Sequence, residues 1–212
     1  MQIEYISSTD LKDCVRQPLT VEGTLMVMPF INTSQAQQAA QLMSSRAASP
    51  GRVLAIHDSN QSGFAAIVNA AFKVSQSTYF GYVAQDAYAG RQWLKLAVEA
   101  LGQNKSFLGF NDGKWAGAIA GFGLAKRAWA QANYAGDFFY SGYQRHYADA
   151  ELTLLALQAG LYAYDANSVL IEVDWDKDQA CVDPADRALF AQRKLGQFDG
   201  RITSQPLLDL IA

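Results

Sequence analysis

The first half of the chain alternates between apolar runs and amphipathic, helix-forming segments. The apolar runs predict strands that are covered on both faces, because such strands read as nearly continuous hydrophobic sequence. The strands are expected at residues 24–30, 52–56 and 79–83, and the helices at 35–48, 63–75 and 92–101. Strands that alternate with helices predict an α/β fold with a parallel, doubly wound sheet.

The second half breaks this rhythm. Residues 107–110 predict a short strand, and residues 116–124 are small, apolar and glycine-rich, which suits a close approach of the backbone to a neighbour. Two helices are expected at 148–160 and 186–195, with a strand at 169–173 between them. We therefore expect an irregular second half. Because no repeat or linker separates the halves, a single domain is the simplest prediction.

Composition narrows the function classes. The chain has 212 residues, half of them hydrophobic, and a formal net charge of −3. That charge provides no basic field for a nucleic-acid backbone, so no nucleic-acid partner is expected. No apolar run approaches the roughly 18 residues of a membrane-spanning helix, so no integral membrane segment is expected. The first 13 residues lack the pattern of a signal peptide, which favours a cytoplasmic location.

Polar residues follow each strand of the expected parallel half. Asn32 follows the first, Asp58 the second, and Gln85 and Asp86 the third. The carboxyl ends of neighbouring parallel strands lie at one edge of a sheet, where ligands bind. A nucleotide across this edge would contact Asp58, and Asp86 would reach its diphosphate through a metal ion. The alternative for any single residue here is a helix cap or a turn.

Two further acidic clusters stand out. Asp149 and Glu151 stand at the start of a predicted helix. Acidic residues there are either stabilised by the helix dipole, as capping residues, or positioned to act as a general base. Asp149 is our candidate base, whereas Glu151 would point elsewhere, as a structural anchor. The cluster from Glu172 to Asp178 is either a solvated acidic turn or the place where Asp174 or Asp176 completes a metal site.

Several segments, in this order, resemble motifs of family 2 glycosyltransferases with the GT-A fold. Val27 to Asn32 resembles their opening strand, and Ile56 to Asn60 the ending of their second strand. Gly63-Phe64 and Asn69-Ala70-Ala71 resemble the helix before the metal motif, and Ala84-Gln85-Asp86 stands where that family has Asp-x-Asp. Gly121 to Arg127 resembles the acceptor-side segment, and Ala148 to Leu152 the Glu-Asp-x-Asp-Leu box.

The resemblance implies a GT-A-type sheet and a glycosyltransferase. Its donor would be a nucleotide-diphosphate sugar, its acceptor hydroxyl is unknown, its cofactor would be Mn²⁺ or Mg²⁺, and transfer would invert the anomeric centre. Residues 1–23 would be an irregular lead-in, 24–105 the nucleotide-binding half, 106–178 the acceptor and catalytic half, and 179–212 a C-terminal helix and tail.

The resemblance also implies roles for individual residues, to which we add Trp115 because aromatic faces suit sugar rings. The catalytic base would be Asp149, the nucleotide contacts Pro29, Asn32, Asp58, Asn69 and Gln85, the metal ligands Asp86 and Asp174, and the acceptor side Trp115, Gly121, Phe122, Gly123 and Glu151.

The chain also departs from the family pattern. Ala84 stands where the metal motif has its first Asp, and Ala148 replaces a carboxylate of the acidic box. One alternative is therefore a non-catalytic nucleotide- or sugar-binding protein of the same fold. A second is a nucleotidyltransferase, but the segment from Pro29 to Gln35 lacks the basic residue that would hold a triphosphate.

Overall fold

The computed structural model describes residues 1–15, 17–173 and 182–211, and one mixed sheet of eight strands runs through this part of the chain. The strand order is β1-β4-β3-β6-β9-β8-β10-β7. These strands are β1 (Gln2–Ser7), β3 (Thr24–Phe30), β4 (Gly51–His57), β6 (Tyr79–Tyr82), β7 (Ala87–Ala89), β8 (Phe107–Asn111), β9 (Gly123–Lys126) and β10 (Tyr162–Glu172). Two short strands, β2 (Leu19–Thr20) and β5 (Ser75–Gln76), pair separately.

The sheet is parallel over its first four positions and mixed over the rest. Strands β1, β4, β3 and β6 pair in parallel. Strand β9 is antiparallel to both β6 and β8, β10 is parallel to β8, and β7 is antiparallel to β10. The predicted parallel half and the predicted change of rhythm after it are therefore both present.

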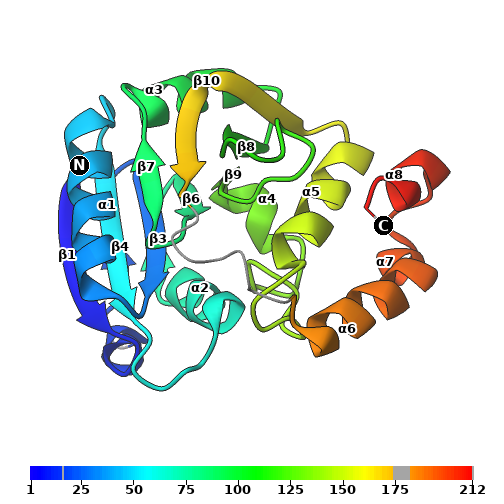
Figure 1. Cartoon of the computed structure of the whole chain (residues 1–212), viewed down its shortest axis with the longest axis horizontal. Helices are drawn as coiled ribbons and strands as arrows, with labels where there is room; N and C mark the ends of the chain where they lie inside the picture. Colours follow the sequence, from blue (N-terminus) through cyan, green and yellow to red (C-terminus); the bar gives the residue numbers. More distant parts are fainter. Residues whose placement is uncertain (16, 174–181, 212) are drawn as a thin grey trace.

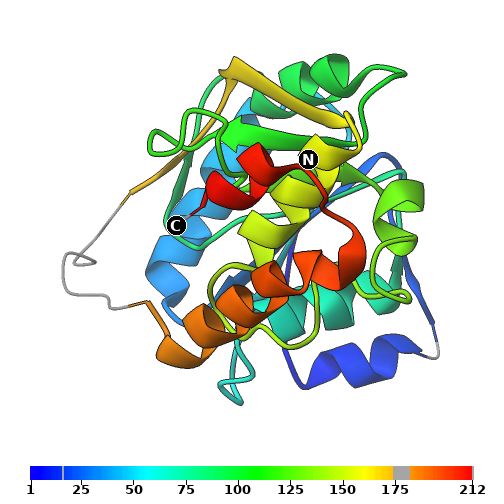
Figure 2. The same cartoon turned by 90° about the vertical axis from the view of Figure 1, so that its right-hand side faces the viewer.

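Helices cover both faces of the sheet (Figures 1 and 2). The α-helices are α1 (Thr33–Arg46), α2 (Phe64–Lys73), α3 (Trp93–Leu101), α4 (Arg127–Gln131), α5 (Ala148–Gln158), α6 (Pro184–Leu195), α7 (Gln197–Gly200) and α8 (Gln205–Asp209), and Asp10–Val15 forms a 3₁₀ turn, η1. Apolar residues of α1 and α3 join one core cluster, and those of α2 and α5 join the other.

Strand β3 shows why the apolar runs fold as central strands. All seven of its residues are buried. Leu25 and Val27 face the core cluster of α2 and α5, whereas Met26 and Met28 face that of α1 and α3. Successive side chains of a strand point to opposite faces, so a strand between two helical layers needs apolar residues at every position.

The first 23 residues correct one prediction, because they are not an irregular lead-in. Strand β1 pairs with β4 along its whole length, from Gln2 opposite Arg52 to Ser7 opposite His57. The strand lies at the end of the sheet order and carries polar residues, including Glu4, which forms a 2.6 Å ion pair with Arg52. Its sequence lacks the apolar run of a central strand, and its partner lies about 50 positions away.

The late strand β10 is longer than the predicted strand at 169–173. It begins at Tyr162, and its register against β8 shifts between Tyr164 and Val169. The sequence Asp165-Ala166-Asn167 is typical of a turn, but it lies within the strand at this shift in register.

The parallel strands bring their carboxyl ends to one edge. Phe30 at the end of β3 is in register with His57 at the end of β4, and their rings lie 5.3 Å apart. The backbone N–H of Asp58 then donates to the carbonyl of Phe30 at 2.8 Å. Among the helices in the described ranges, none is long and apolar enough to cross a bilayer.

Candidate active site

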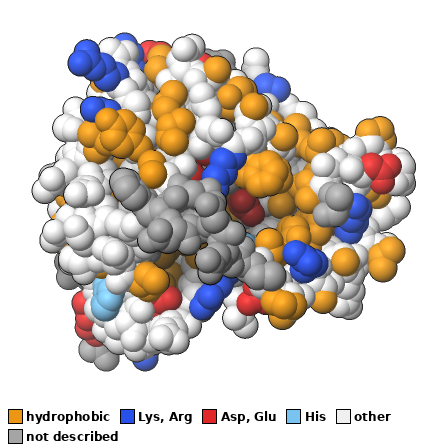
Figure 3. Space-filling model, viewed as in Figure 1, with side chains coloured by type: hydrophobic (Ala, Val, Ile, Leu, Met, Phe, Trp, Pro, Cys, Tyr) orange, Lys and Arg blue, Asp and Glu red, His pale blue; other side chains and the backbone are white. Residues whose placement is uncertain are grey.

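A cavity of about 570 Å³ opens between the end of β6 and the start of α5. Its lining includes Tyr82 at the end of β6 and Ala84 after it, residues between Lys114 and Phe122, residues from Arg145 to Ala150, and Glu172 at the end of β10. Phe64, Phe139, Val182, Leu210 and Ile211 complete it. Figure 3 shows this face hollowed where acidic, basic and hydrophobic side chains meet.

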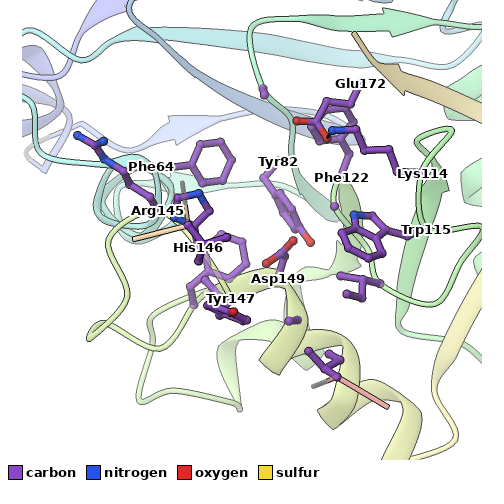
Figure 4. Close-up of a pocket in the computed structure, with 18 of the residues that line it drawn as sticks. Phe64, Tyr82, Lys114, Trp115, Phe122, Arg145, His146, Tyr147, Asp149 and Glu172 are labelled. Atoms are coloured by element: carbon purple, nitrogen blue, oxygen red, sulfur yellow. Dashed lines mark ion pairs between the residues drawn. The ribbon is translucent and has the colours of Figure 1, made fainter. Parts of the chain in front are cut away.

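Asp149 is the second residue of α5, and its half-buried carboxylate points into the cavity toward Tyr82 (Figure 4). Burial raises the pKa of Asp149 to about 6, against the opposing effect of backbone N–H groups, and the charges of Glu172 and Asp112 raise it further. A carboxylate with this pKa is mostly ionised at neutral pH, yet is more basic than an exposed one. Asp149 can therefore accept a proton from a bound hydroxyl.

The segment before α5 is fixed by Asp186 of α6. The buried Asp186 carboxylate accepts hydrogen bonds from the backbone N–H groups of Gln144, Arg145 and His146, at 2.9, 2.8 and 2.8 Å. Next, Tyr147 adopts a left-handed conformation with φ 67°, which non-glycine residues keep only when their surroundings enforce it. Its ring stacks on Phe190 with centroids 4.6 Å apart, so α6 sets where α5 begins.

The opposite wall is built around Asp112, which is also buried. Its Oδ1 accepts from the backbone N–H groups of Lys114 and Trp115, at 2.9 and 3.0 Å. Its Oδ2 is buried without a hydrogen bond among the described residues. A Cβ added to Gly121 would lie 2.7 Å from this oxygen, so glycine is required for the close approach that the glycine-rich sequence indicates.

Charged groups of both signs lie at the cavity. Lys114 and Glu172 form a 3.0 Å ion pair on the side of Asp112, which accepts a backbone hydrogen bond from each of them. Arg145 and His146 stand at the rim on the other side of Asp149 from Trp115 (Figure 4). This combination offers cations for a phosphate and a carboxylate for a hydroxyl in the same space.

Four of the predicted residues line this one cavity: Asp149, Trp115, Gly121 and Phe122. Gly123 follows directly in β9 and is buried beside Phe107 and Tyr82. The base candidate and most of the predicted acceptor side therefore lie together, although they come from segments that are far apart in sequence.

The predicted nucleotide contacts make structural hydrogen bonds at the edge of the sheet. Asp58 accepts from the N–H groups of Ser62 and Gly63, at 2.8 and 3.1 Å. Gln85 Oε1 accepts from the N–H groups of Ile31 and Asn32, both at 2.8 Å, and Asn32 caps α1. Pro29 is buried within β3.

Asn69 holds a loop of the cavity wall. Its side chain accepts from the N–H groups of Phe138 and Phe139 and donates to the carbonyl of Phe139, at 2.8–3.1 Å. Because Phe139 lines the cavity, Asn69 shapes it indirectly.

Asp86 and Glu151 lie apart from Asp149. Asp86 is buried and lines a second groove of about 630 Å³ beside α1, and its neighbour Gln85 lines the same groove. Glu151 is fully buried within hydrogen-bonding distance of Arg193 Nε and Nη2, both at 2.7 Å, and does not line the cavity. Its contacts match the structural anchor, not an acceptor contact. Asp174 and Asp176 lie outside the described residues.

Reasoning from the sequence missed several residues at the site. Lys114, Arg145 and Glu172 line the cavity, and Asp112 and Asp186 hold its walls. Asp112 lies in an Asn-Asp-Gly-Lys sequence, whose turn chemistry was a usable signal. Asp186 gave none, because its three partners lie about 40 residues away.

Comparisons with known proteins show the fold. No protein-family model and no curated protein matches the sequence. A mannosyltransferase from Pyrobaculum calidifontis, solved with GDP-Man and Mn²⁺, aligns with TM-score 0.58 and 13% identity over 96% of this chain and 74% of its own. A glucosyl-3-phosphoglycerate synthase from Mycobacterium tuberculosis, solved with Mg²⁺ and UDP, aligns with TM-score 0.55 and 10% identity over 96% of this chain and 88% of its own. The chain has the GT-A fold of these glycosyltransferases.

Proposed function

We propose that this chain is a glycosyltransferase that moves a sugar from a nucleotide-diphosphate sugar to an acceptor hydroxyl with inversion. The observation that carries the proposal is the carboxylate of Asp149, which stands in a cavity at the sheet edge of a GT-A fold with its pKa raised to about 6. The structural neighbours, which bind GDP-Man or UDP, support this class of donor.

The chemistry is a single displacement. The Asp149 carboxylate takes the proton of the acceptor hydroxyl while that oxygen forms a bond to the anomeric carbon. The bond from this carbon to the diphosphate oxygen breaks on the opposite side, and the nucleoside diphosphate leaves with the electron pair. Lys114 and Arg145 line the same cavity, and their charges would favour the negative charge that develops on the leaving diphosphate.

A divalent metal belongs to the proposal as a partner of the diphosphate. No group of three possible His, Cys, Asp or Glu ligands occurs within the described parts of the chain. Mg²⁺ is nevertheless commonly held by one or two carboxylates together with substrate phosphates, so a carboxylate such as Asp86 fits this donor set. Asp86 and Asp174 would hold the ion, which would neutralise diphosphate charge when bound.

The nucleotide would lie along the edge formed by the ends of β3, β4 and β6. Asp58 and Asn32 are placed there by the register of β3 against β4. Carboxylate and amide oxygens have more than one lone pair, so the hydrogen bonds that Asp58 and Asn32 accept leave capacity for a ribose or base. We assign Pro29, Asn69 and Gln85 to shaping this edge.

The test combines binding and turnover. Calorimetry with UDP, GDP and other nucleoside diphosphates, with and without Mn²⁺, measures donor-site affinity, and release of free sugar from the matching nucleotide sugar measures turnover. Asp149→Asn should keep the affinity and lower turnover by about 10²- to 10⁴-fold, the usual contribution of a general base. The exposed Asp13→Asn is the matched control. Normal turnover in Asp149→Asn would exclude Asp149 as the base.

A non-catalytic binding protein of the same fold is the second candidate. It is favoured by Ala84, which lines the cavity where the family motif has a carboxylate, and by the position of Asp86 in a separate groove. This candidate predicts nucleotide binding without sugar release, in the wild type as in Asp149→Asn.

A further inference from the structure

Charged and apolar side chains both stand around Asp149 in the cavity, with Phe64 near Arg145 and His146 and Lys114 near Trp115 (Figure 4). Arg145 and His146 stand on one side, and Trp115 stands on the other (Figure 4). The lining also includes three purely apolar residues, Ile119, Leu210 and Ile211. We call Trp115 and these three residues the apolar wall. Trp115 and Leu210 are each 47% exposed, so much of their apolar surface remains available to a ligand.

The loop that carries Trp115 and Ile119 is held in place. Asp112 accepts a hydrogen bond from the backbone N–H of Trp115 at 3.0 Å, and the carbonyl of Trp115 accepts from Ala118 at 2.8 Å. Gly117, with φ 84°, packs its backbone against the ring of Tyr164, where any Cβ would clash at 2.5 Å. These contacts fix the loop before a ligand arrives.

Hydrogen bonds from α5 and α6 also hold the segment that carries Leu210 and Ile211. Gln158 Oε1 in α5 accepts from the N–H groups of Thr203 and Ser204, at 3.2 and 3.1 Å. Lys194 of α6 donates to the carbonyl of Ile211 at 2.7 Å. The apolar wall is therefore already ordered in the folded protein. A ligand that covers it would bind with little loss of the protein's conformational entropy.

We propose that the acceptor is amphipathic, with its reactive hydroxyl at Asp149 and an alkyl or aryl group attached beside it along the apolar wall. This inference rests on the proposed glycosyl transfer. Within the apolar wall, a bare sugar would use mainly the face of Trp115, because Ile119, Leu210 and Ile211 offer no hydrogen-bonding side chain. An attached apolar group would cover the exposed surface of Trp115 and Leu210 and gain from its removal from water.

Binding of alkyl glycosides tests this. Methyl, butyl and hexyl β-glycosides of glucose, mannose and N-acetylglucosamine are titrated below their micelle concentrations, with and without a saturating nucleoside diphosphate. Each buried methylene is worth about 0.8 kcal/mol, or about fourfold in affinity. The partly open wall should give at least a tenfold gain from methyl to hexyl. Equal affinities for methyl and hexyl would overturn the inference.

Variants locate the effect. Leu210→Ser and Ile119→Ser should each remove most of the hexyl gain, so that the ratio of hexyl to methyl affinity falls toward one. Leu195→Ser is the matched control, because Leu195 is 88% exposed on α6 and does not line the cavity. The inference fails if Leu195→Ser weakens hexyl binding as much as Leu210→Ser.

The two proposals fail separately. Nucleoside diphosphate binding without any chain-length dependence would keep glycosyl transfer and remove the amphipathic acceptor. A hexyl gain that Leu210→Ser removes, in a protein that binds no nucleoside diphosphate, would support the apolar wall and overturn glycosyl transfer.

Discussion

At the scale of one residue, the burial of Asp149 has opposite effects on stability and on basicity. Burial disfavours its charge, and the charges of Glu172 and Asp112 disfavour it further, so its pKa rises from 3.8 to about 6. Such a group lowers the stability of the fold when ionised, but it is a better proton acceptor for that reason. Site residues that reduce stability in this way are common where chemistry takes place.

The first prediction concerns the pH dependence of turnover. The proposed mechanism requires an ionised Asp149, so sugar transfer should rise as pH increases through about 6 and level off above 7. Initial rates between pH 4.5 and 8.5 at saturating donor give the profile, with nucleotide affinity measured at each pH as the control. A rate that is flat across pH 5–7 contradicts the assignment.

The second prediction concerns stability. The raised pKa means that the native state holds the Asp149 proton more tightly than the unfolded chain does. Its energetic penalty is absent below about pH 3.8, grows as pH rises, and is complete above about 6. Asp149→Asn should therefore raise the free energy of unfolding at pH 7.5 by at most about 3 kcal/mol, with the gain vanishing near pH 4. Urea unfolding at both pH values measures this, and an equal gain at both would contradict it.

The third prediction concerns the close approach of Gly121 to Asp112. A Cβ on residue 121 would lie 2.7 Å from Asp112 Oδ2, which leaves no room for a methyl group. Asp112 cannot move away without losing its hydrogen bonds from Lys114 and Trp115. Gly121→Ala should cost about 1–3 kcal/mol of stability, as overpacking does. Gly196→Ala, where the nearest atom is 3.6 Å away at φ −83°, is the control and should stay within about 0.5 kcal/mol.

At the scale of elements, two residues of α6 hold the N-terminal end of α5. Asp186 holds the backbone that leads into α5, and Arg193 of α6 binds Glu151 inside it. Tyr134 and Tyr143 also donate to Glu151, each at 2.9 Å, so a fully buried carboxylate is surrounded by donors. Helix α6 therefore acts as a clamp on the helix that carries Asp149.

The fourth prediction tests this clamp. Arg193→Met leaves the Glu151 charge buried without its cation and should cost about 3–5 kcal/mol, the usual effect of breaking a buried pair. Arg187→Met on the exposed face of the same helix should cost little. Adding Glu151→Gln to Arg193→Met should restore part of the loss, and no recovery would mean that the pair is not the source.

Sequence reasoning found the elements whose apolar runs are continuous. Strands β3, β4 and β6 were expected within one or two residues, because burial on both faces leaves a clear pattern. The polar edge strand β1 and the three- and four-residue strands β7 and β9 were not expected, because distant pairing forms them and little local pattern marks them.

The candidate site was also predictable only where local sequence marks a residue, and not where distant contacts determine its role. Asp149, Trp115 and Phe122 stand out by residue type, whereas the partners of Glu151 and Asp186 depend on α6 folding back onto α5. Asp86 follows a strand end as expected. The groove that it lines is formed with α1, and the packing of that helix on the sheet cannot be read from the local sequence.

At the scale of the whole molecule, the fold joins a parallel half of the sheet to a mixed half through β6 and β9. The cavity lies beside this junction, because Tyr82 ends β6 and Phe122 precedes β9. Helices α2 and α5 then cover the same face. A ligand across the cavity would touch segments from both halves and should stabilise the whole domain.

The fifth prediction follows from that geometry. A nucleoside diphosphate at about 100 times its Kd should add about 2.7 kcal/mol, which corresponds to about 5–10 °C in Tm for a chain of this size. Mn²⁺ should enlarge the shift, and Asp86→Ala should remove the enlargement without lowering the ligand-free Tm by more than a few degrees. Asp13→Ala is the control, and a metal effect that persists in Asp86→Ala would place the ion elsewhere.

The bidentate contact between Glu151 and Arg193 also limits how this protein can be shortened. A version that stops before α6 would retain the buried Glu151 side chain without its Arg193 partner, and the helix carrying Asp149 would lose its support. Minimal catalytic fragments should therefore extend past Arg193, and those that stop earlier should accumulate as insoluble material.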